Sequence, residues 1–215
     1  MKQFVVVGLG RFGSSLARSL AEKGHNVLAI DIDEERVQNI VDVVTHAVEA
    51  DATDEDALNT LGVRNFDIAV VSIGNNLHAN ILTTLILKEM GIPYVVAKAQ
   101  DNLHGKILTK VGADRVVYPE RDMGIRIAHN LISSNVLDYI EFAPDYSVIE
   151  IIATPGMEGK SLEELEFRTK YRVNVMAIKR GEHLNMNPGA RDKILEEDVL
   201  IVMGRNENLD KVKEI

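Results

Sequence analysis

The hydrophobic pattern of the first 118 residues repeats one unit, a helical segment followed by a glycine and a short apolar run. The glycines at the helix ends are Gly24, Gly62, Gly91 and Gly112, residues that accept the left-handed conformation common after a helix. Apolar, β-branched runs that predict buried strands lie at residues 3–7, 27–30, 46–50, 67–73, 94–97 and 115–118. Strands alternating with helices predict an α/β fold, a Rossmann-like doubly wound six-stranded parallel sheet covered on both faces.

A long crossover helix is predicted next, over residues 122–137. Residues four apart share a helix face. Two apolar stripes follow this spacing: Met123, Ile127 and Leu131, and Ala128, Ile132 and Val136. Together they form a face broader than packing on one sheet needs, so we expect contact with a partner subunit, the alternative being burial against the C-terminal half.

The last third predicts a small α+β domain. A hinge is expected at residues 143–145 and strands at 146–153, 172–179 and 199–203. Ser161 and Glu164 form a capping-box pattern that predicts a short helix, a polar loop follows around Pro188, and a closing helix spans 208–215. About seventy residues is near the size at which one core is marginal, so we expect dimerisation. The predicted domains are residues 1–137 and 138–215.

Composition and charge narrow the function classes. The 215 residues include no cysteine, which excludes disulfides and thiolate metal sites. A net charge of −9 argues against nucleic acid as a partner, because such binding neutralises phosphates with basic patches. No apolar run approaches the ~20 residues that span a bilayer, and the chain enters a strand at once. We therefore expect a soluble, cytoplasmic protein.

The strongest chemical signal is the turn Gly8-Leu9-Gly10-Arg11-Phe12-Gly13, placed between the first strand and its helix. Gly8 permits the tight turn, Gly10 lets a phosphate approach the backbone, and Gly13 lets the helix pack close to the strand. The helix N-terminus then faces an anion. Asp31 ends the second strand, where a carboxylate can accept hydrogen bonds from ribose hydroxyls. The sequence predicts a nucleotide site.

Other candidates follow later strands on the same sheet edge. Asp51, Ala52 and Thr53 could pass beside an adenine ring, or Thr53 could only cap the next helix. Ile73 and Gly74 could approach a ribose or phosphate, or form a simple turn, and Lys98 could meet a phosphate or stay solvated.

Arg11 changes the expected ligand. It lies inside the glycine turn, where a guanidinium can bind phosphate oxygens in a fork. A hydride-transferring enzyme needs no charge at this position. Arg11 therefore favours a nucleotide with more phosphate charge than a dinucleotide.

Taken together, four segments resemble the KTN/RCK regulatory subunits of bacterial potassium transporters, with the Ktr branch the nearest. They are the glycine turn, Asp31-Ile32-Asp33, Asp51-Ala52-Thr53 and residues 118–124. Residues 146–215 resemble the RCK_C (TrkA-C) domain of this family. The resemblance spans the whole chain and implies a homodimer that assembles into an octameric cytosolic ring beneath a membrane-embedded potassium-uptake subunit.

The resemblance also implies ligands and contacts. ATP or ADP would bind in the N-terminal domain and change the shape of the ring. The glycines would cradle phosphates, Asp31 would hold ribose, Arg11 would meet the terminal phosphate, and Glu120 would help to hold a divalent cation (Mg²⁺ or Ca²⁺). Phe12, Ile32 and Asp33 belong to the same motifs and would lie at the nucleotide. Arg168 would contact cyclic di-AMP in the C-terminal domain.

Alternative functions stay open at this point. The Trk branch uses NAD or NADH, and Asp31 suits either ligand. A dehydrogenase would need an acid–base residue at the nicotinamide, for which His78, His104 and His183 are candidates, although each is more readily a surface or helix-start residue. A purely structural protein is disfavoured because Arg11, Asp31 and Gly74 converge on one edge. We expect a regulatory protein rather than an enzyme.

Overall fold

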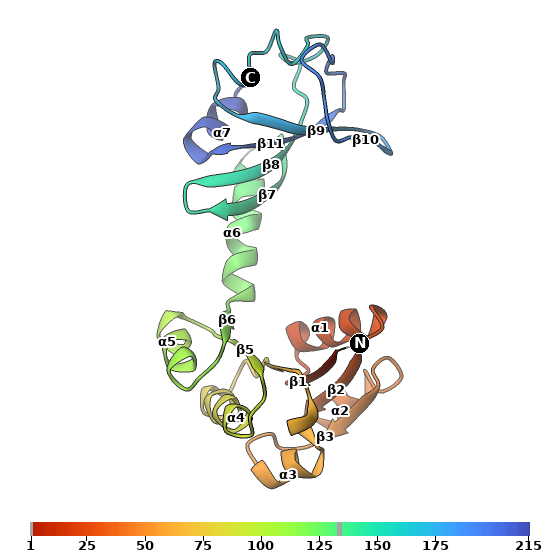
Figure 1. Ribbon diagram of the computed structural model, residues 1–215, viewed down its shortest axis with the longest axis vertical. Helices are drawn as coiled ribbons and strands as arrows, with labels where there is room; N and C mark the ends of the chain where they lie inside the picture. The colour runs from red at the N-terminus through yellow and green to blue at the C-terminus, as the bar shows by residue number, and fades with distance from the viewer. Residues whose placement is uncertain (1, 133–134) are drawn as a thin grey trace. The chain divides into compact units, whose positions relative to one another are not determined.

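The computed structural model describes residues 2–132 and 135–215. By their contacts the residues divide into two compact units, Met1–Glu120 and Arg121–Ile215 (Figure 1). The division into domains after residue 137 stays a prediction. In the part of the chain that is described, no helix has the length and apolar character needed to cross a bilayer.

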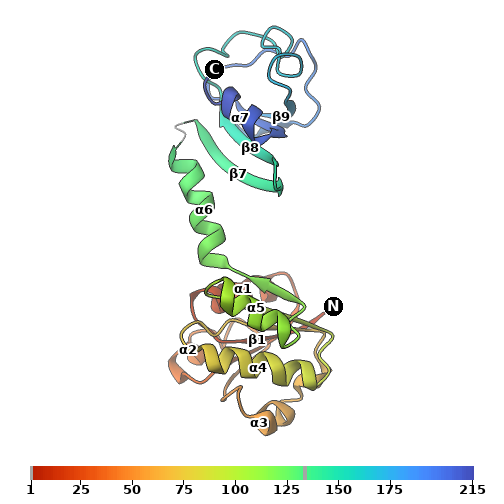
Figure 2. The same ribbon diagram turned by 90° about the vertical axis from the view of Figure 1, so that its left-hand side faces the viewer.

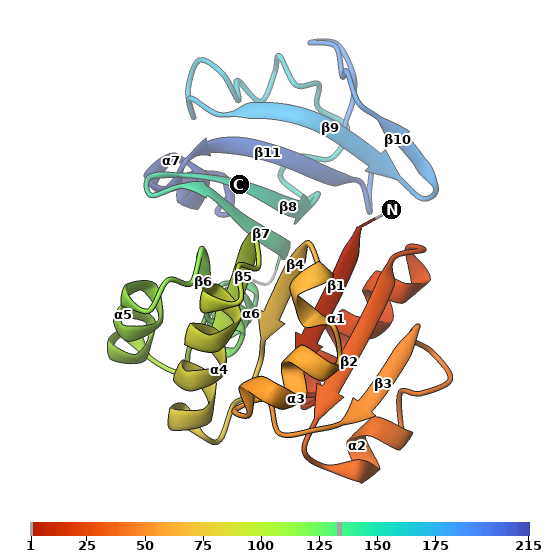
Figure 3. The same ribbon diagram turned by 60° about the horizontal axis from the view of Figure 1, so that its bottom comes forward.

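The first unit is built on a six-stranded parallel sheet of order β3-β2-β1-β4-β5-β6 (Figure 3). Its strands are β1 (Gln3–Val7), β2 (Asn26–Asp31), β3 (His46–Glu49), β4 (Ile68–Val71), β5 (Tyr94–Lys98) and β6 (Arg115–Val117). Its helices are α1 (Arg11–Glu22), α2 (Glu34–Gln38), α3 (Glu55–Thr60), the 3₁₀ turn η1 (Val63–Asn65), α4 (Leu77–Glu89) and α5 (Asn102–Lys110). This confirms the predicted doubly wound sheet.

Alternating residues of the central strand explain why the sheet is covered on both faces. Val5 and Val7 are buried in a core shared with α3, α4 and α5, whereas Val6 is buried in a second core shared with α1 and α2. The predicted helix-ending glycines are left-handed, with φ of +79° at Gly24 and +86° at Gly91. Strand β4 ends at Val71, two residues earlier than predicted, which leaves Ile73 in the loop beyond the sheet.

The second unit holds a five-stranded antiparallel sheet of order β10-β9-β11-β8-β7. Its strands are β7 (Val136–Ala143), β8 (Tyr146–Ile152), β9 (Asn174–Arg180), β10 (His183–Asn185) and β11 (Val199–Arg205). Helix α6 (Pro119–Ile132) precedes the sheet and α7 (Asn206–Val212) follows it. Helix α7 contacts β8 and β11 (Figure 2). The predicted α+β character is confirmed.

The crossover helix was predicted too long. Val136 and Leu137, assigned to it by their spacing, instead begin β7, where Val136 pairs with Ile151 of β8 and is buried. The residues at 143–145 are not a hinge, because Ala143 pairs with Tyr146 and the two residues between them turn the β7–β8 hairpin. Hydrogen-bond pairing with β8 makes this segment a strand. The helical spacing of its apolar residues gives no information about such pairing.

Two smaller predictions also need correction. Ser161 and Glu164 make the reciprocal capping-box hydrogen bonds, with Glu164 Oε2 accepting from the Ser161 N–H at 2.7 Å, yet residues 162–170 form turns rather than a helix. The polar loop expected around Pro188 is present, and it follows a short edge strand, β10, that the pattern did not predict. The last helix begins two residues early, at Asn206.

The first apolar stripe of α6, formed by Met123, Ile127 and Leu131, is exposed to solvent in the single chain. Met123 and Ile127 are each 49% exposed, and Leu131 is 80% exposed. The predicted Ile132 side chain lies outside the described residues. The expectation of a partner subunit stays a prediction.

A buried carboxylate paired with a half-exposed arginine gives the stability of the second unit a defined pH dependence. The fully buried Asp198 carboxylate accepts hydrogen bonds from Arg180 Nε and Nη2, each at 2.7 Å, and from the Leu195 N–H at 2.8 Å. The Arg180 hydrogen bonds outweigh desolvation and hold the pKa of Asp198 below its ordinary 3.8. A lowered carboxyl pKa stabilises the fold above the unfolded-state pKa, and this stability is lost as the pH falls through the folded-state pKa.

We expect Asp198→Asn to destabilise the second unit by about 2–3 kcal/mol, because Arg180 loses a charged hydrogen-bond acceptor. Faster hydrogen exchange of the β9 and β11 amides would report this loss. The acid-dependent part of the unfolding free energy, measured by urea denaturation at about pH 6 and about pH 3, should also shrink in the variant.

Asp210→Asn is the matched control. Asp210 pairs with Lys213 at 2.8 Å, but its side chain is 69% exposed, so its loss should cost under about 0.5 kcal/mol. Equal, small effects of the two substitutions would contradict the role given to the buried carboxylate.

Candidate nucleotide-binding site

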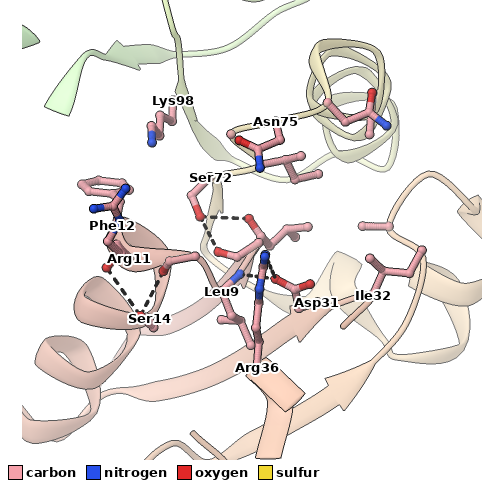
Figure 4. A pocket seen from close by; sticks show the side chains of 18 of the residues that line it. Leu9, Arg11, Phe12, Ser14, Asp31, Ile32, Arg36, Ser72, Asn75 and Lys98 are labelled. Atoms are coloured by element: carbon pink, nitrogen blue, oxygen red, sulfur yellow. Dashed lines mark hydrogen bonds and ion pairs between the residues drawn. The ribbon is translucent and has the colours of Figure 1, made fainter. Parts of the chain in front are cut away.

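A pocket of about 820 Å³ opens at the carboxyl edge of the parallel sheet, wholly within the first unit. Its walls are the glycine turn, the end of β2, the loops after β3 and β4, the end of β5 and the start of α6 (Figure 4). Ligands of doubly wound folds bind at this edge. The pocket is large enough for a nucleotide.

The glycine turn brings α1 very close to β1 and β4. Gly8 has a φ of +90°, and a Cβ there would lie 2.9 Å from the Ile73 backbone nitrogen. A Cβ on Gly13 would lie 1.9 Å from the Gly8 carbonyl oxygen and 2.3 Å from Ser72 Oγ. Gly13 therefore packs the helix against the turn and does not line the pocket. Gly10, in contrast, faces open space.

The N-terminus of α1 lies at the pocket, where its first backbone N–H groups suit an anion. The helix begins at Arg11, its N-cap is Gly10, which provides no capping side chain, and its first turn contains no acidic residue. The first N–H groups of a helix have no partner inside the helix, and its dipole is positive there. A phosphate is the ligand that such an end accepts best.

Asp31 is buried at the end of β2 and supports the turn itself. Its Oδ2 accepts a hydrogen bond from the Leu9 N–H at 2.5 Å, and its Oδ1 accepts one from the Asp33 N–H at 3.0 Å. Arg36 Nη1 also approaches Oδ2, so the further acceptor site lies on Oδ1. Asp31 can therefore hold the turn in place and accept a ribose hydroxyl as well.

Two arginines at the end of the pocket that holds Asp31 were not predicted from the sequence as site residues. Arg36 Nη1 lies 3.5 Å from Asp31 Oδ2, and its Nε lies 3.2 Å from Asp33 Oδ2. Arg18 donates a hydrogen bond to the Asn39 carbonyl. Both arginines line the pocket. Their spacing offered a weak signal, because Arg18 follows Arg11 by two helical turns, and Arg36 follows Asp33 by three residues.

Arg11, Lys98 and Glu120 gather at the other end. Lys98 Nζ forms an ion pair with Glu120 Oε1, and the Lys98 side chain is only 12% exposed. The Lys98 hydrogen bond lowers the pKa of Glu120, and the charge of Arg11 adds to this effect. Figure 4 shows Arg11 and Lys98 on the side of the pocket away from Asp31. Two cations and a carboxylate beside a helix N-terminus suit phosphates with a bound cation.

The loop after β3 is held from two directions. Asp51 Oδ1 accepts hydrogen bonds from the Thr53 N–H at 2.9 Å and the Thr53 hydroxyl at 2.7 Å, which lower the pKa of Asp51. The buried Thr83 hydroxyl donates to the Ala52 carbonyl at 3.1 Å. Asp54, not Thr53, caps the following helix. Thr53 therefore belongs to the wall of the pocket.

Most of the predicted residues meet at this pocket. Those that line it are Gly8, Gly10, Arg11, Phe12, Asp31, Ile32, Asp51, Ala52, Thr53, Ile73, Gly74, Lys98 and Glu120. Asp33 instead caps α2, accepting from the Glu35 N–H at 3.0 Å. Arg168 lies in the second unit, where it donates to Asn174 Oδ1 at 3.0 Å. Sequence reasoning missed Asn75 and Asn76 of the lining, among others.

The residues considered for other chemistry lie elsewhere. His78, His104 and His183 are not among the lining residues. His104 is 3% exposed, and its Nδ1 accepts from the Gln100 N–H at 3.3 Å; burial lowers its pKa. Among residues 2–132 and 135–215, no group of three or more His, Asp or Glu is arranged to hold a metal ion.

Comparison with known proteins identifies the family. The TrkA-N domain model matches residues 4–119, and the TrkA-C domain model matches residues 147–215. The chain is 50% identical over 203 residues to Ktr system potassium uptake protein C of Bacillus subtilis (strain 168), covering 94% of this chain and 92% of that protein. It is 46% identical over 210 residues to Ktr system potassium uptake protein A of the same strain, covering 98% and 95%.

Solved structures agree at the level of the fold. The GsuK RCK domain has a TM-score of 0.69 at 18% identity and covers 99% of this chain and 47% of its own. The GsuK channel bound to NAD has a TM-score of 0.67 at 17% identity and covers 97% and 38%. The chain spans less than half the length of each of these GsuK chains.

The two domain models match both units, and the identity to the two Bacillus proteins is 50% and 46% over nearly the whole length. The resemblance inferred from the motifs is thereby confirmed. The chain belongs to the KTN/RCK family of regulatory subunits of bacterial Ktr potassium-uptake systems.

Proposed function

We propose that this chain is the nucleotide-sensing gating subunit of a potassium-uptake transporter. ATP or ADP binds in the pocket of the first unit, and the two ligands favour different conformations of a homo-oligomeric ring. The ring, an octamer built from dimers, acts at the cytoplasmic face of the membrane through a membrane-embedded transporter subunit. We assign no catalytic residue; the two Bacillus relatives are Ktr system potassium uptake proteins.

The observation that carries the proposal is the phosphate end of the pocket. Arg11 and the Lys98–Glu120 ion pair lie beside the N-terminus of α1. The third phosphate of ATP would contact these charged groups, whereas the two phosphates of ADP would not reach them. A divalent cation held by Glu120 and the phosphates would strengthen this difference, since Mg²⁺ in proteins commonly binds one or two carboxylates plus substrate phosphates.

The mechanism is a shift between conformations. A ligand moves such an equilibrium only as far as its affinities for the two states differ. Glu120 is the second residue of α6, the helix through which the chain passes from the first unit to the second. A contact made at Glu120 by ATP with its cation, and not by ADP, acts on the start of this helix.

NAD or NADH is the second candidate ligand. Asp31 at the end of β2 suits the ribose of a dinucleotide as well as that of ATP, and the GsuK channel bound to NAD shares the fold. Cyclic di-AMP is a further proposed ligand, of the second unit, where Arg168 would contact a phosphate.

Potassium flux into liposomes tests the function directly. Vesicles holding a Ktr membrane subunit would be loaded with this protein and with ATP or ADP, and ⁸⁶Rb⁺ uptake would be measured. We expect ATP and ADP to give uptake rates that differ about tenfold, a coupling typical of allosteric proteins. Equal rates with ATP, with ADP and with no nucleotide would contradict the proposal.

A further inference from the structure

Asn80 is a polar side chain buried where a hydrophobic one would be expected. It lies in the first turn of α4 and is 0% exposed. A buried amide needs hydrogen-bond partners, and an asparagine is a poor helix former. Its partners therefore show what the residue does.

The Asn80 amide joins the ends of two neighbouring strands. Nδ2 donates to the Ile73 carbonyl at 2.7 Å and to the Lys98 carbonyl at 3.1 Å. The ladder between β4 and β5 ends at the pair Val71 and Ala97. Both carbonyls therefore lie just beyond the last paired residues, and Asn80 replaces the ladder hydrogen bonds that the strands no longer make.

These two carbonyls flank the phosphate end of the pocket. Ile73 precedes Gly74, and Lys98 carries the ammonium that pairs with Glu120. Lys98 Nζ lies 3.8 Å from the point that a Cβ on Gly74 would occupy. The separation between the Gly74 loop and the Lys98 ammonium is set by the backbone that Asn80 bridges and by Gln100, whose Nε2 donates to the Gly74 carbonyl. Figure 4 shows Lys98 and, from the Gly74 loop, Asn75 at the upper edge of the pocket.

The other half of the amide is left without a partner. Asn80 Oδ1 is buried and accepts no hydrogen bond in the described part of the chain. Nδ2 donates to two backbone carbonyls, which cannot donate a hydrogen bond. Exchanging the positions of Nδ2 and Oδ1 would therefore leave Oδ1 facing two acceptors. An apolar side chain would avoid an unsatisfied acceptor. The residue thus holds the two carbonyls at a cost that packing alone does not require.

We propose that Asn80 is a positioning residue for phosphate binding, which acts through the backbone of Lys98 and Gly74. The inference rests on the proposed nucleotide site. Without the Nδ2 bridge the Ile73 and Lys98 carbonyls lose their common donor, so the Lys98 backbone shifts and the ammonium no longer points at the phosphates. Asn80 touches no ligand itself, so its effect should depend on Lys98.

A double-mutant cycle tests this dependence. ATP affinity is measured by calorimetry for the wild type, Asn80→Ala, Lys98→Ala and the double variant, and adenosine affinity by displacement of labelled ATP. We expect Asn80→Ala to weaken ATP binding about tenfold and adenosine binding less than about twofold. A tenfold loss of ATP affinity lies within the range of coupling energies measured for residues in contact. In the Lys98→Ala background, the same substitution should change ATP affinity less than about twofold.

Thr84→Val is the matched control. Thr84 is also fully buried on α4, but its hydroxyl donates to the Asn80 backbone carbonyl at 2.8 Å and not to a loop of the pocket. We expect it to leave ATP affinity unchanged. If Asn80→Ala does not fold, Asn80→Ser, whose hydroxyl can donate to one carbonyl, replaces it in the cycle and should show the same dependence on Lys98.

Two results would overturn the inference. They are equal losses for ATP and adenosine, or an unchanged loss when Lys98 is already alanine, since a merely structural role predicts both. The wild-type titration reports separately on the proposed function. If the wild type binds no nucleotide, the proposed function fails and the role of Asn80 fails with it. If the wild type binds ATP and the cycle shows no coupling, only the role of Asn80 fails.

Discussion

Gly13→Ala should unfold the nucleotide-binding edge of the first unit and abolish nucleotide binding. The added methyl group would lie 1.9 Å from the Gly8 carbonyl oxygen and 2.3 Å from Ser72 Oγ, inside the packed contact of α1 with β1 and β4. Neither neighbour can move far, because Ser72 Oγ itself donates to the Val7 carbonyl at 3.2 Å. We expect a destabilisation of about 3 kcal/mol, the upper end of ordinary overpacking. Hydrogen exchange of the β1 and β4 amides measures it.

Gly10→Ala separates packing from ligand binding in the same turn. A Cβ on Gly10 has no atom within 4 Å, and its φ of −64° is open to any residue. We therefore expect no clash, and a loss of only about 1 kcal/mol because alanine is a poorer N-cap than glycine. ATP affinity should nevertheless fall about tenfold, because the methyl group occupies the space of an approaching phosphate. Wild-type stability of Gly13→Ala, or unchanged ATP affinity of Gly10→Ala, would contradict this division of roles.

Arg11→Ala should weaken ATP binding much more than ADP binding. A charge-assisted hydrogen bond between a guanidinium and a phosphate contributes about 1.5–3 kcal/mol. That range corresponds to about a 10- to 100-fold loss of ATP affinity. ADP affinity should fall by less than about threefold, because ADP lacks the phosphate that Arg11 is proposed to meet. Calorimetric titration of the variant with both nucleotides measures the two losses.

Arg18→Ala provides the matched control. Arg18 lies on the same helix and also lines the pocket, but its guanidinium is engaged by the Asn39 carbonyl. We expect the loss of Arg18 to change ATP and ADP affinity by the same small factor. Equal losses for ATP and ADP in Arg11→Ala would defeat the assignment of Arg11 to the terminal phosphate.

The part of the site that sequence reasoning found is the part whose chemistry is local in the chain. Gly8 and Gly10 are fixed by the turn they must make, and Asp31 follows from the end of a strand that the pattern locates well. The sheet edge then gathers the residues that end the other strands, which is why Lys98 could be placed from the sequence as well.

The residues that were missed depend on where helices lie in space. Arg36 reaches Asp31 only because α2 lies beside β2 and β3, and Asn80 matters only because two strand ends meet above α4. The three-residue spacing of Arg36 from Asp33 is only a weak signal of the first juxtaposition, and the spacing of residues gives no signal of the second. The same limit explains β7, where Val136 fits a helical stripe and a paired strand equally well, and pairing with β8 decides between them.

The central claim is that the first unit binds ATP and ADP and distinguishes them through a cation at Glu120. Calorimetric titration of the purified protein with ATP, ADP, NAD and NADH, each with and without Mg²⁺, tests it most directly. We predict tight binding of both adenine nucleotides, with Mg²⁺ strengthening ATP binding chiefly and with that effect lost in Glu120→Gln. A preference for NADH, with no effect of Mg²⁺ on ATP binding, would contradict the account and place the protein among dinucleotide-sensing regulators.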